Sequence, residues 1–122
     1  MDFKEMLKPG GKGILSTASN TGIVNTAVYA VPHIVEKDVL AWGMTDGRTW
    51  SNIQENPHAA YSYFAPGDGY WGTRFTLVLA RTEDSGEMLE AIRERARTKS
   101  PVNPAVIRHV AYFKVVETRP LA

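Results

Sequence analysis

The sequence predicts a mainly β protein, a small β-barrel with α-helical additions. Around six short segments rich in β-branched and aromatic residues are separated by Gly, Pro, Asn and Asp turns. The helical patterns are few and lie outside these segments, which favours a barrel over alternating strands and helices. With 122 residues and 43% hydrophobic content there is enough apolar material for one core, so we expect a single domain over residues 1–122.

The predicted strands are β-branched or alternating in pattern and end at turn residues. Residues 33–35 and 39–44 flank a polar turn and indicate a hairpin, and in residues 72–82 Phe75, Leu77 and Leu79 share one face. The strand segments are 12–19, 23–32, 33–35, 39–44, 58–65, 72–82 and 108–117. We expect six strands in the barrel.

Three helices are predicted. A short amphipathic helix covers residues 2–8, and a second short helix follows the strand 39–44 and ends at Asn56-Pro57, since a residue before proline disfavours the α region. The one long helix covers residues 85–99, with Ser85 or Asp84 as its cap.

The long helix has an apolar stripe of Met88, Leu89, Ile92 and Ala96. Its basic residues alternate with glutamates, a pattern typical of a solvated face. The basic set is Arg93, Arg95, Arg97 and Lys99.

Composition excludes several classes of function. The net charge of +1 and the lack of a basic run argue against nucleic acid as a partner. No cysteine is present, which excludes disulfides, thiolate catalysis and cysteine-ligated metals. Because the N-terminus is polar and no apolar run has membrane-spanning length, we expect a cytoplasmic protein without membrane contact.

No intrinsic catalytic apparatus is predicted. His33, His58 and His109 are widely separated in the sequence, and no pair of them has a metal-ligand spacing. No Gly-x-Ser-x-Gly motif is present, and the acidic pair Glu83-Asp84 is typical of a cap or a surface. We therefore assign no catalytic and no metal-ligating residue, and we expect a cofactor to supply any chemistry.

Residues 43–57 form the most informative segment. An apolar strand leads into a turn with Gly, Thr, Asp and Arg, and a short helix follows. Exposed backbone N–H groups at a helix start favour an anion, and Arg48 and Thr49 can add hydrogen bonds to a phosphate. Such turns before helices also have purely structural roles, so this segment alone leaves both interpretations open.

Two further features favour a nucleotide-like cofactor. Asn25 and Thr26 are polar residues within the strand 23–32. Either a specific hydrogen-bonding role or a position on a solvent-exposed face of the sheet can explain them. Aromatic residues are dense, and rings line flat ligand pockets, cores and interfaces alike. The aromatic set is Trp42, Trp50, Tyr61, Tyr63, Phe64, Tyr70 and Trp71.

Together these features resemble a known family. The order is a strand with Val24-Asn25-Thr26, a strand ending in Gly43-Met44-Thr45, an Arg48-Thr49 turn leading to Asn52-Ile53, and then Glu55-Asn56-Pro57. This order, over essentially the whole chain, resembles the pyridoxamine 5′-phosphate oxidase-like, FMN-binding split barrel, and most of all the small single-domain FMN-binding proteins of anaerobic bacteria. The resemblance implies a six-stranded antiparallel split β-barrel and the cofactor FMN.

The resemblance also implies roles for individual residues. Asn25, Thr26 and Ala27 would run along the flavin, and Gly43, Met44 and Thr45 would lie against its ring and ribityl chain. Arg48 and Thr49 would hold the phosphate, with Asn52 as a further candidate. Small relatives often have a tryptophan at the position of Ala27.

Members of this family bind the flavin at a homodimer interface, so the resemblance implies a homodimer whose second subunit contributes residues, with 106–108 as the candidates. The leading hypothesis is an FMN-binding flavoprotein that acts as a redox carrier or a flavin-dependent oxidoreductase. The alternatives are a split-barrel module that binds or stores a flavin, or another flat phosphorylated or haem-like molecule, without redox turnover, and a deazaflavin-dependent reductase.

Overall fold

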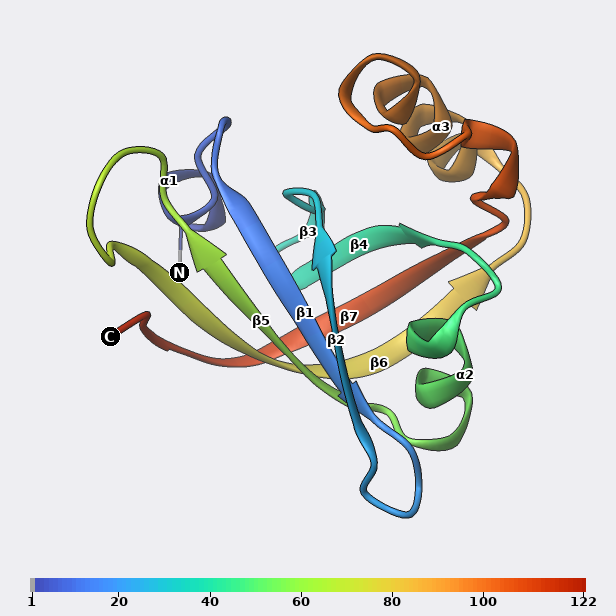
Figure 1. Ribbon diagram of the computed structural model, residues 1–122, viewed down its shortest axis with the longest axis horizontal. Helices are drawn as coiled ribbons and strands as arrows, with labels where there is room; N and C mark the ends of the chain where they lie inside the picture. Colours follow the sequence, from blue (N-terminus) through green and yellow to red (C-terminus); the bar gives the residue numbers. More distant parts are fainter. Residues whose placement is uncertain (1) are drawn as a thin grey trace.

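The computed structural model describes residues 2–122, and its strands pair in a single antiparallel sheet (Figure 1). The strands are β1 (Lys12–Ala18), β2 (Val24–Tyr29), β3 (His33–Glu36), β4 (Val39–Met44), β5 (His58–Phe64), β6 (Gly72–Glu83) and β7 (His109–Pro120). The helices are α1 (Phe3–Met6), α2 (Arg48–Glu55) and α3 (Glu87–Lys99), with a 3-10 turn η1 (Pro104–Val106). The predicted mainly β class with three helices is confirmed.

The sheet has seven strands in the order β2-β1-β5-β6-β7-β4-β3 and is not closed, so the prediction of a six-stranded barrel is wrong. β2 and β3 form its two edges. The sequence pattern predicts one strand through 23–32, whereas β2 ends at Tyr29. Pro32 has no N–H to donate to a ladder, and the chain then turns into β3, which pairs with β4 as the predicted hairpin.

The core lies on the concave side of the sheet, where strand residues alternate between buried and exposed positions. In β1 every second residue is buried, and Leu15 is completely so. It packs in one cluster with Tyr61, Phe75 and Phe113, which are also completely buried. The alternation predicted for β6 holds at Phe75 and Leu77 and weakens at Leu79, beside a shift in the β6–β7 register.

A second apolar cluster lies under α3. Leu89 and Ile92 are buried against β4 and β7, while Met88 and Ala96 pack at its margin. This confirms the apolar stripe predicted for the long helix. The packing attaches α3 to the end of the sheet where β4 leaves for α2.

The start of α3 differs from the prediction. The N-cap is Gly86, with φ of +118°, and no side chain bonds to the helix start. A positive φ favours glycine, so the helix begins after Gly86 and neither Ser85 nor Asp84 caps it. The Asp84 carboxylate is used elsewhere, as described below.

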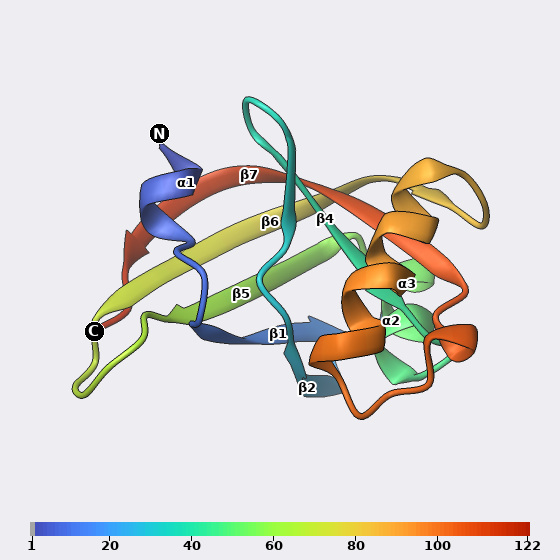
Figure 2. The same ribbon diagram turned by 90° about the horizontal axis from the view of Figure 1, so that it is seen from above.

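Helices α2 and α3 lie at one end of the molecule, and α1 lies at the other with the C-terminus (Figures 1 and 2). Asp2 is the N-cap of α1, and its carboxylate accepts hydrogen bonds from the N–H groups of Lys4 and Glu5. Among residues 2–122, no helix has the length and apolarity needed to cross a membrane. The residues predicted to bind the cofactor belong to β2, β4, the turn after β4 and α2.

Candidate functional site

The predicted residues of β2 point to two different faces. Asn25, Ala27 and Tyr29 are half-buried, while Val24, Thr26 and Val28 on the other face are exposed. The Asn25 Nδ2 donates to the Thr49 Oγ1 at 3.4 Å, so β2 and the start of α2 are in contact. Within the predicted set, the structure thus brings Asn25 to Thr49 and places Thr26 on the outer face.

The start of α2 is open to solvent on one side. Arg48 is the first residue of the helix and is exposed, and within residues 2–122 no carboxylate pairs with it. The N-cap residue is Gly47, so no side chain satisfies the first N–H groups of the helix. The helix start therefore offers backbone donors and an unneutralised guanidinium to an anion.

Thr49 and Asn52 attach α2 to the sheet. Thr49 is one of two buried polar side chains among the described residues. Burial raises the pKa of the neighbouring Tyr29 phenol, and the Thr49 hydroxyl lowers it by a smaller amount. The Asn52 Nδ2 donates to the Thr17 Oγ1 of β1 at 3.1 Å.

The end of β4 is closely packed. Met44 is 1% exposed and lies in the core, so its backbone rather than its side chain faces the β4–α2 turn. A Cβ atom at Gly43 would lie 2.5 Å from the Ile92 Cγ2 and 2.8 Å from the Ile107 Cγ2. Glycine at this position therefore lets α3 approach β4.

A cleft of about 280 Å³ opens between β2, the end of β4 and α3. Tyr29 and Trp42 give it aromatic walls, and Gly43 and Thr45 are the two predicted site residues that line it. Tyr29 also lies near the Thr49 hydroxyl, so the cleft is next to the start of α2.

Two cations of α3, Arg95 and Lys99, also line the cleft. The prediction of a solvated basic face is wrong at Arg93 and Arg95, which are both half-buried. The Arg93 Nε donates to the Ile107 carbonyl at 2.9 Å, and the Arg95 Nη2 donates to the Val31 carbonyl at 2.6 Å. Burial lowers the pKa of the Arg95 guanidinium. The main-chain bond turns this arginine inward, and the one-dimensional charge pattern cannot reveal such a bond.

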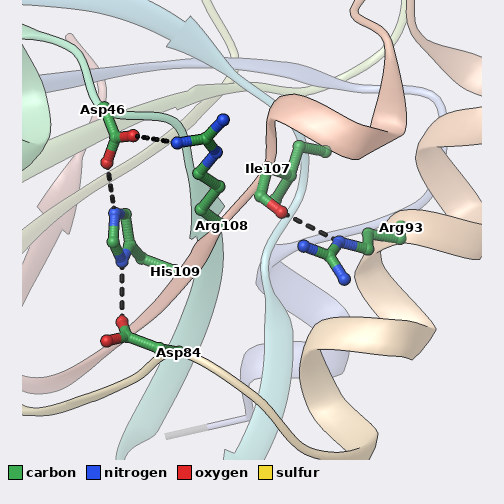
Figure 3. Close-up of polar contacts among 6 residues, drawn as sticks. All are labelled: Asp46, Asp84, Arg93, Ile107, Arg108 and His109. Carbon is green, nitrogen blue, oxygen red and sulfur yellow. Dashed lines mark hydrogen bonds and ion pairs between the residues drawn. The ribbon is translucent and has the colours of Figure 1, made fainter.

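A polar cluster lies beside the α2 start, centred on His109 (Figure 3). The His109 Nε2 is 2.5 Å from the Asp46 Oδ1, and the Nδ1 is 2.7 Å from the Asp84 Oδ1. Arg108 contacts the second Asp46 oxygen at 3.1 Å. The Trp50 indole stacks on the imidazole, with ring centroids 3.7 Å apart.

The charges of this cluster are linked. Partial burial by itself would lower the pKa of His109, but the carboxylates of Asp46 and Asp84 raise it overall. The His109 hydrogen bond holds the pKa of Asp46 below its usual value, with help from Arg108. His109 is therefore stabilised as the imidazolium.

Sequence reasoning did not find this cluster, and it interpreted Asp84 as a cap. Its members come from the β4–α2 turn, α2, the β6–α3 loop and β7, and no local spacing connects them. Arg108 lies in the segment predicted to reach a second subunit, and in this chain its guanidinium contacts Asp46. Among residues 2–122 no group of three or more His, Asp or Glu side chains is arranged to hold a metal ion.

No family model matches the sequence, and no curated protein matches it significantly. Solved structures do match. An FMN-binding protein from Syntrophomonas wolfei subsp. wolfei is 20% identical with a TM-score of 0.77, covering 90% of this chain and 76% of that one.

An F420 reductase is 19% identical with a TM-score of 0.70, covering 95% and 94% of the two chains. A candidate pyridoxamine 5′-phosphate oxidase from Listeria innocua is 12% identical with a TM-score of 0.73, covering 98% and 94%. At these identities the similarity identifies the fold.

Proposed function

This chain has the split-barrel fold of the pyridoxamine 5′-phosphate oxidase-like proteins, and from that fold and the site geometry we propose that it binds FMN. The observation that carries the proposal is Arg48. It stands exposed at the first position of α2, without a carboxylate partner within residues 2–122, next to helix N–H groups that no side chain caps. A phosphate monoester would satisfy both the guanidinium and these donors.

The neighbouring residues fit the same ligand. Thr49 and Asn25 supply a hydroxyl and an amide directly beside the phosphate anchor. Thr45 and Gly43 line the cleft next to the start of α2, and the Tyr29 and Trp42 rings form walls that suit a flat molecule. Anchor and cleft together match a cofactor with a phosphate at one end and a planar ring at the other.

The proposed activity is electron or hydride transfer, as a redox carrier or as a flavin-dependent oxidoreductase. FMN supplies this chemistry when it is bound. The side chains described here bind and orient the cofactor, and the aromatic walls limit the access of water to it. No side chain is assigned as an acid, a base or a nucleophile.

We further propose that the protein is a homodimer with the cofactor at the interface. β2 is an edge strand, and its outer face with the preceding turn exposes Ile23, Val24 and Val28, each more than 70% exposed. Three large apolar side chains on one exposed edge indicate a contact surface. The segment 106–108 remains the candidate for residues contributed by the second subunit.

The visible spectrum of the purified protein tests the proposal. A yellow protein with flavin absorption bands, or a colourless protein that acquires them with added FMN, supports FMN binding. Bleaching by dithionite and by NADH supports redox activity. If the flavin binds but neither reagent reduces it, the result favours the alternative function, a split-barrel module that binds or stores a flavin without redox turnover. A protein that ignores FMN contradicts the proposal.

A deazaflavin is the second candidate cofactor, and the similarity to an F420 reductase favours it. F420 also carries a phosphate, so the Arg48 anchor suits both molecules. Mass spectrometry of the ligand released from the purified protein separates the two by mass.

A further inference from the structure

The two contacts of His109 require both ring nitrogens to carry a proton. Each nitrogen faces a carboxylate oxygen, at 2.5 Å for Asp46 and 2.7 Å for Asp84. An ionised carboxylate accepts hydrogen bonds and donates none, whereas a neutral imidazole has only one N–H. Only the imidazolium satisfies both acids, and the raised pKa of His109 agrees with this geometry.

His109 of β7 joins two other segments of the chain through Asp46 and Asp84 (Figure 3). Asp46 lies in the β4–α2 turn, two residues before Arg48, and Asp84 lies in the loop between β6 and α3. Trp50 of α2 covers the imidazole with its planes only 2° apart. The turn that presents Arg48 is therefore attached to β7 on both of its sides, through Asp46 before the helix and through Trp50 within it.

We propose that His109 is a positioning residue for the phosphate-binding turn: its imidazolium joins Asp46 to Asp84 and thereby fixes the direction in which Arg48 is presented. This inference rests on the proposed function. The charged groups that face the imidazole are Asp46, Asp84 and, through Asp46, Arg108. When His109 loses a proton, one carboxylate faces a lone pair in place of an N–H, and the turn loosens.

Phosphate affinity then depends on the charge of His109. The second ionisation of a phosphate monoester has a pKa of about 6, so the ligand charge is constant above pH 7. As the pH rises through the raised pKa of His109, we expect FMN to bind about fivefold more weakly, the effect of one lost hydrogen bond.

Two measurements test the inference. The first is NMR of the FMN-free protein, in which the backbone amides of residues 45–49 should shift with the same midpoint as the His109 ring protons. The second is the dissociation constant of FMN against pH, which should change with that midpoint. Asp84→Asn removes one carboxylate without touching the turn and should move both midpoints to lower pH. His58→Gln, at an exposed site on β5, is the matched control and should change neither.

The outcomes separate the two proposals. If FMN binds but the turn amides ignore the titration of His109, or if Asp84→Asn leaves the pH profile of FMN affinity in place, the positioning role is wrong. If the amides follow His109 but FMN does not bind at any pH, the structural link stands, and both the FMN proposal and the role in phosphate binding are wrong.

Discussion

The Trp50 indole lies flat on the His109 imidazole, with ring centroids 3.7 Å and planes 2° apart. Trp50 belongs to α2, and His109 is the first residue of β7. This stack therefore joins the helix of the proposed phosphate site to one of the longest strands. An imidazolium over an aromatic face is also electrostatically favourable.

Replacing Arg48 should weaken FMN binding. A charge-assisted hydrogen bond contributes about 1.5–3 kcal/mol, so Arg48→Ala should raise the dissociation constant about ten- to hundredfold in a fluorescence titration. Arg119→Ala is the control, since that exposed arginine is on β7 near the C-terminus, at the other end of the molecule. An affinity within about twofold of the wild type in Arg48→Ala would refute the assignment.

The outer face of β2 should mediate dimerisation. Val24 is 75% exposed, and an aspartate there would place a charge in the proposed interface. We expect Val24→Asp to be a monomer by light scattering after gel filtration, while the wild type is a dimer. Val116→Asp, at a 52% exposed position on β7, should remain dimeric. A wild-type monomer, or a dimer that survives Val24→Asp, counts against this interface.

A methyl group at Gly43 should destabilise the fold. The added Cβ would collide with Ile92 and Ile107, and overpacking of this kind costs about 1–3 kcal/mol of unfolding free energy. Urea denaturation measures the loss. The double variant Gly43→Ala with Ile92→Ala should lose less than the sum of the two single variants, because the truncated side chain makes room. Strict additivity would show that the predicted collision does not occur.

The stability contributed by His109 should disappear at alkaline pH. Because its pKa is raised in the folded state, its contribution is complete below the unfolded value of about 6.5 and is lost as the pH rises through the folded pKa. The pKa of Asp46 is lowered, so its contribution is lost on acidification instead. Between the folded pKa of Asp46 and the folded pKa of His109, both residues contribute to the stability of the folded protein.

Urea unfolding of the wild type and His109→Gln at about pH 5.5 and pH 9 checks this sign. The difference in unfolding free energy between the two proteins should be larger at the lower pH. A difference that grows towards pH 9 would mean that His109 is neutral in the folded protein, and the two carboxylate contacts would then need another explanation.

Much of the fold follows from local patterns in the sequence. The β3–β4 hairpin, the helix that ends before Pro57 and the apolar stripe of α3 were all predicted, because periodicity, turn residues and proline act over a few positions. The six-stranded barrel was wrong, although the segment of β3 was identified, because no local pattern specifies which strands pair and which remain the open edges of the sheet. The cap of α3 was wrong because the helix begins after Gly86, which has a positive φ, and Asp84 bonds to His109 instead.

The sequence by itself determined that this is a mainly β chain without cysteine and that an arginine stands at the start of a short helix after an apolar strand. Local chemistry suffices for these conclusions. Only the tertiary structure decided that Arg95 turns inward to the Val31 carbonyl and that His109 lies between Asp46 and Asp84. These contacts join residues more than twenty positions apart, and the strand order that brings them together results from packing of the whole sheet rather than from any single segment.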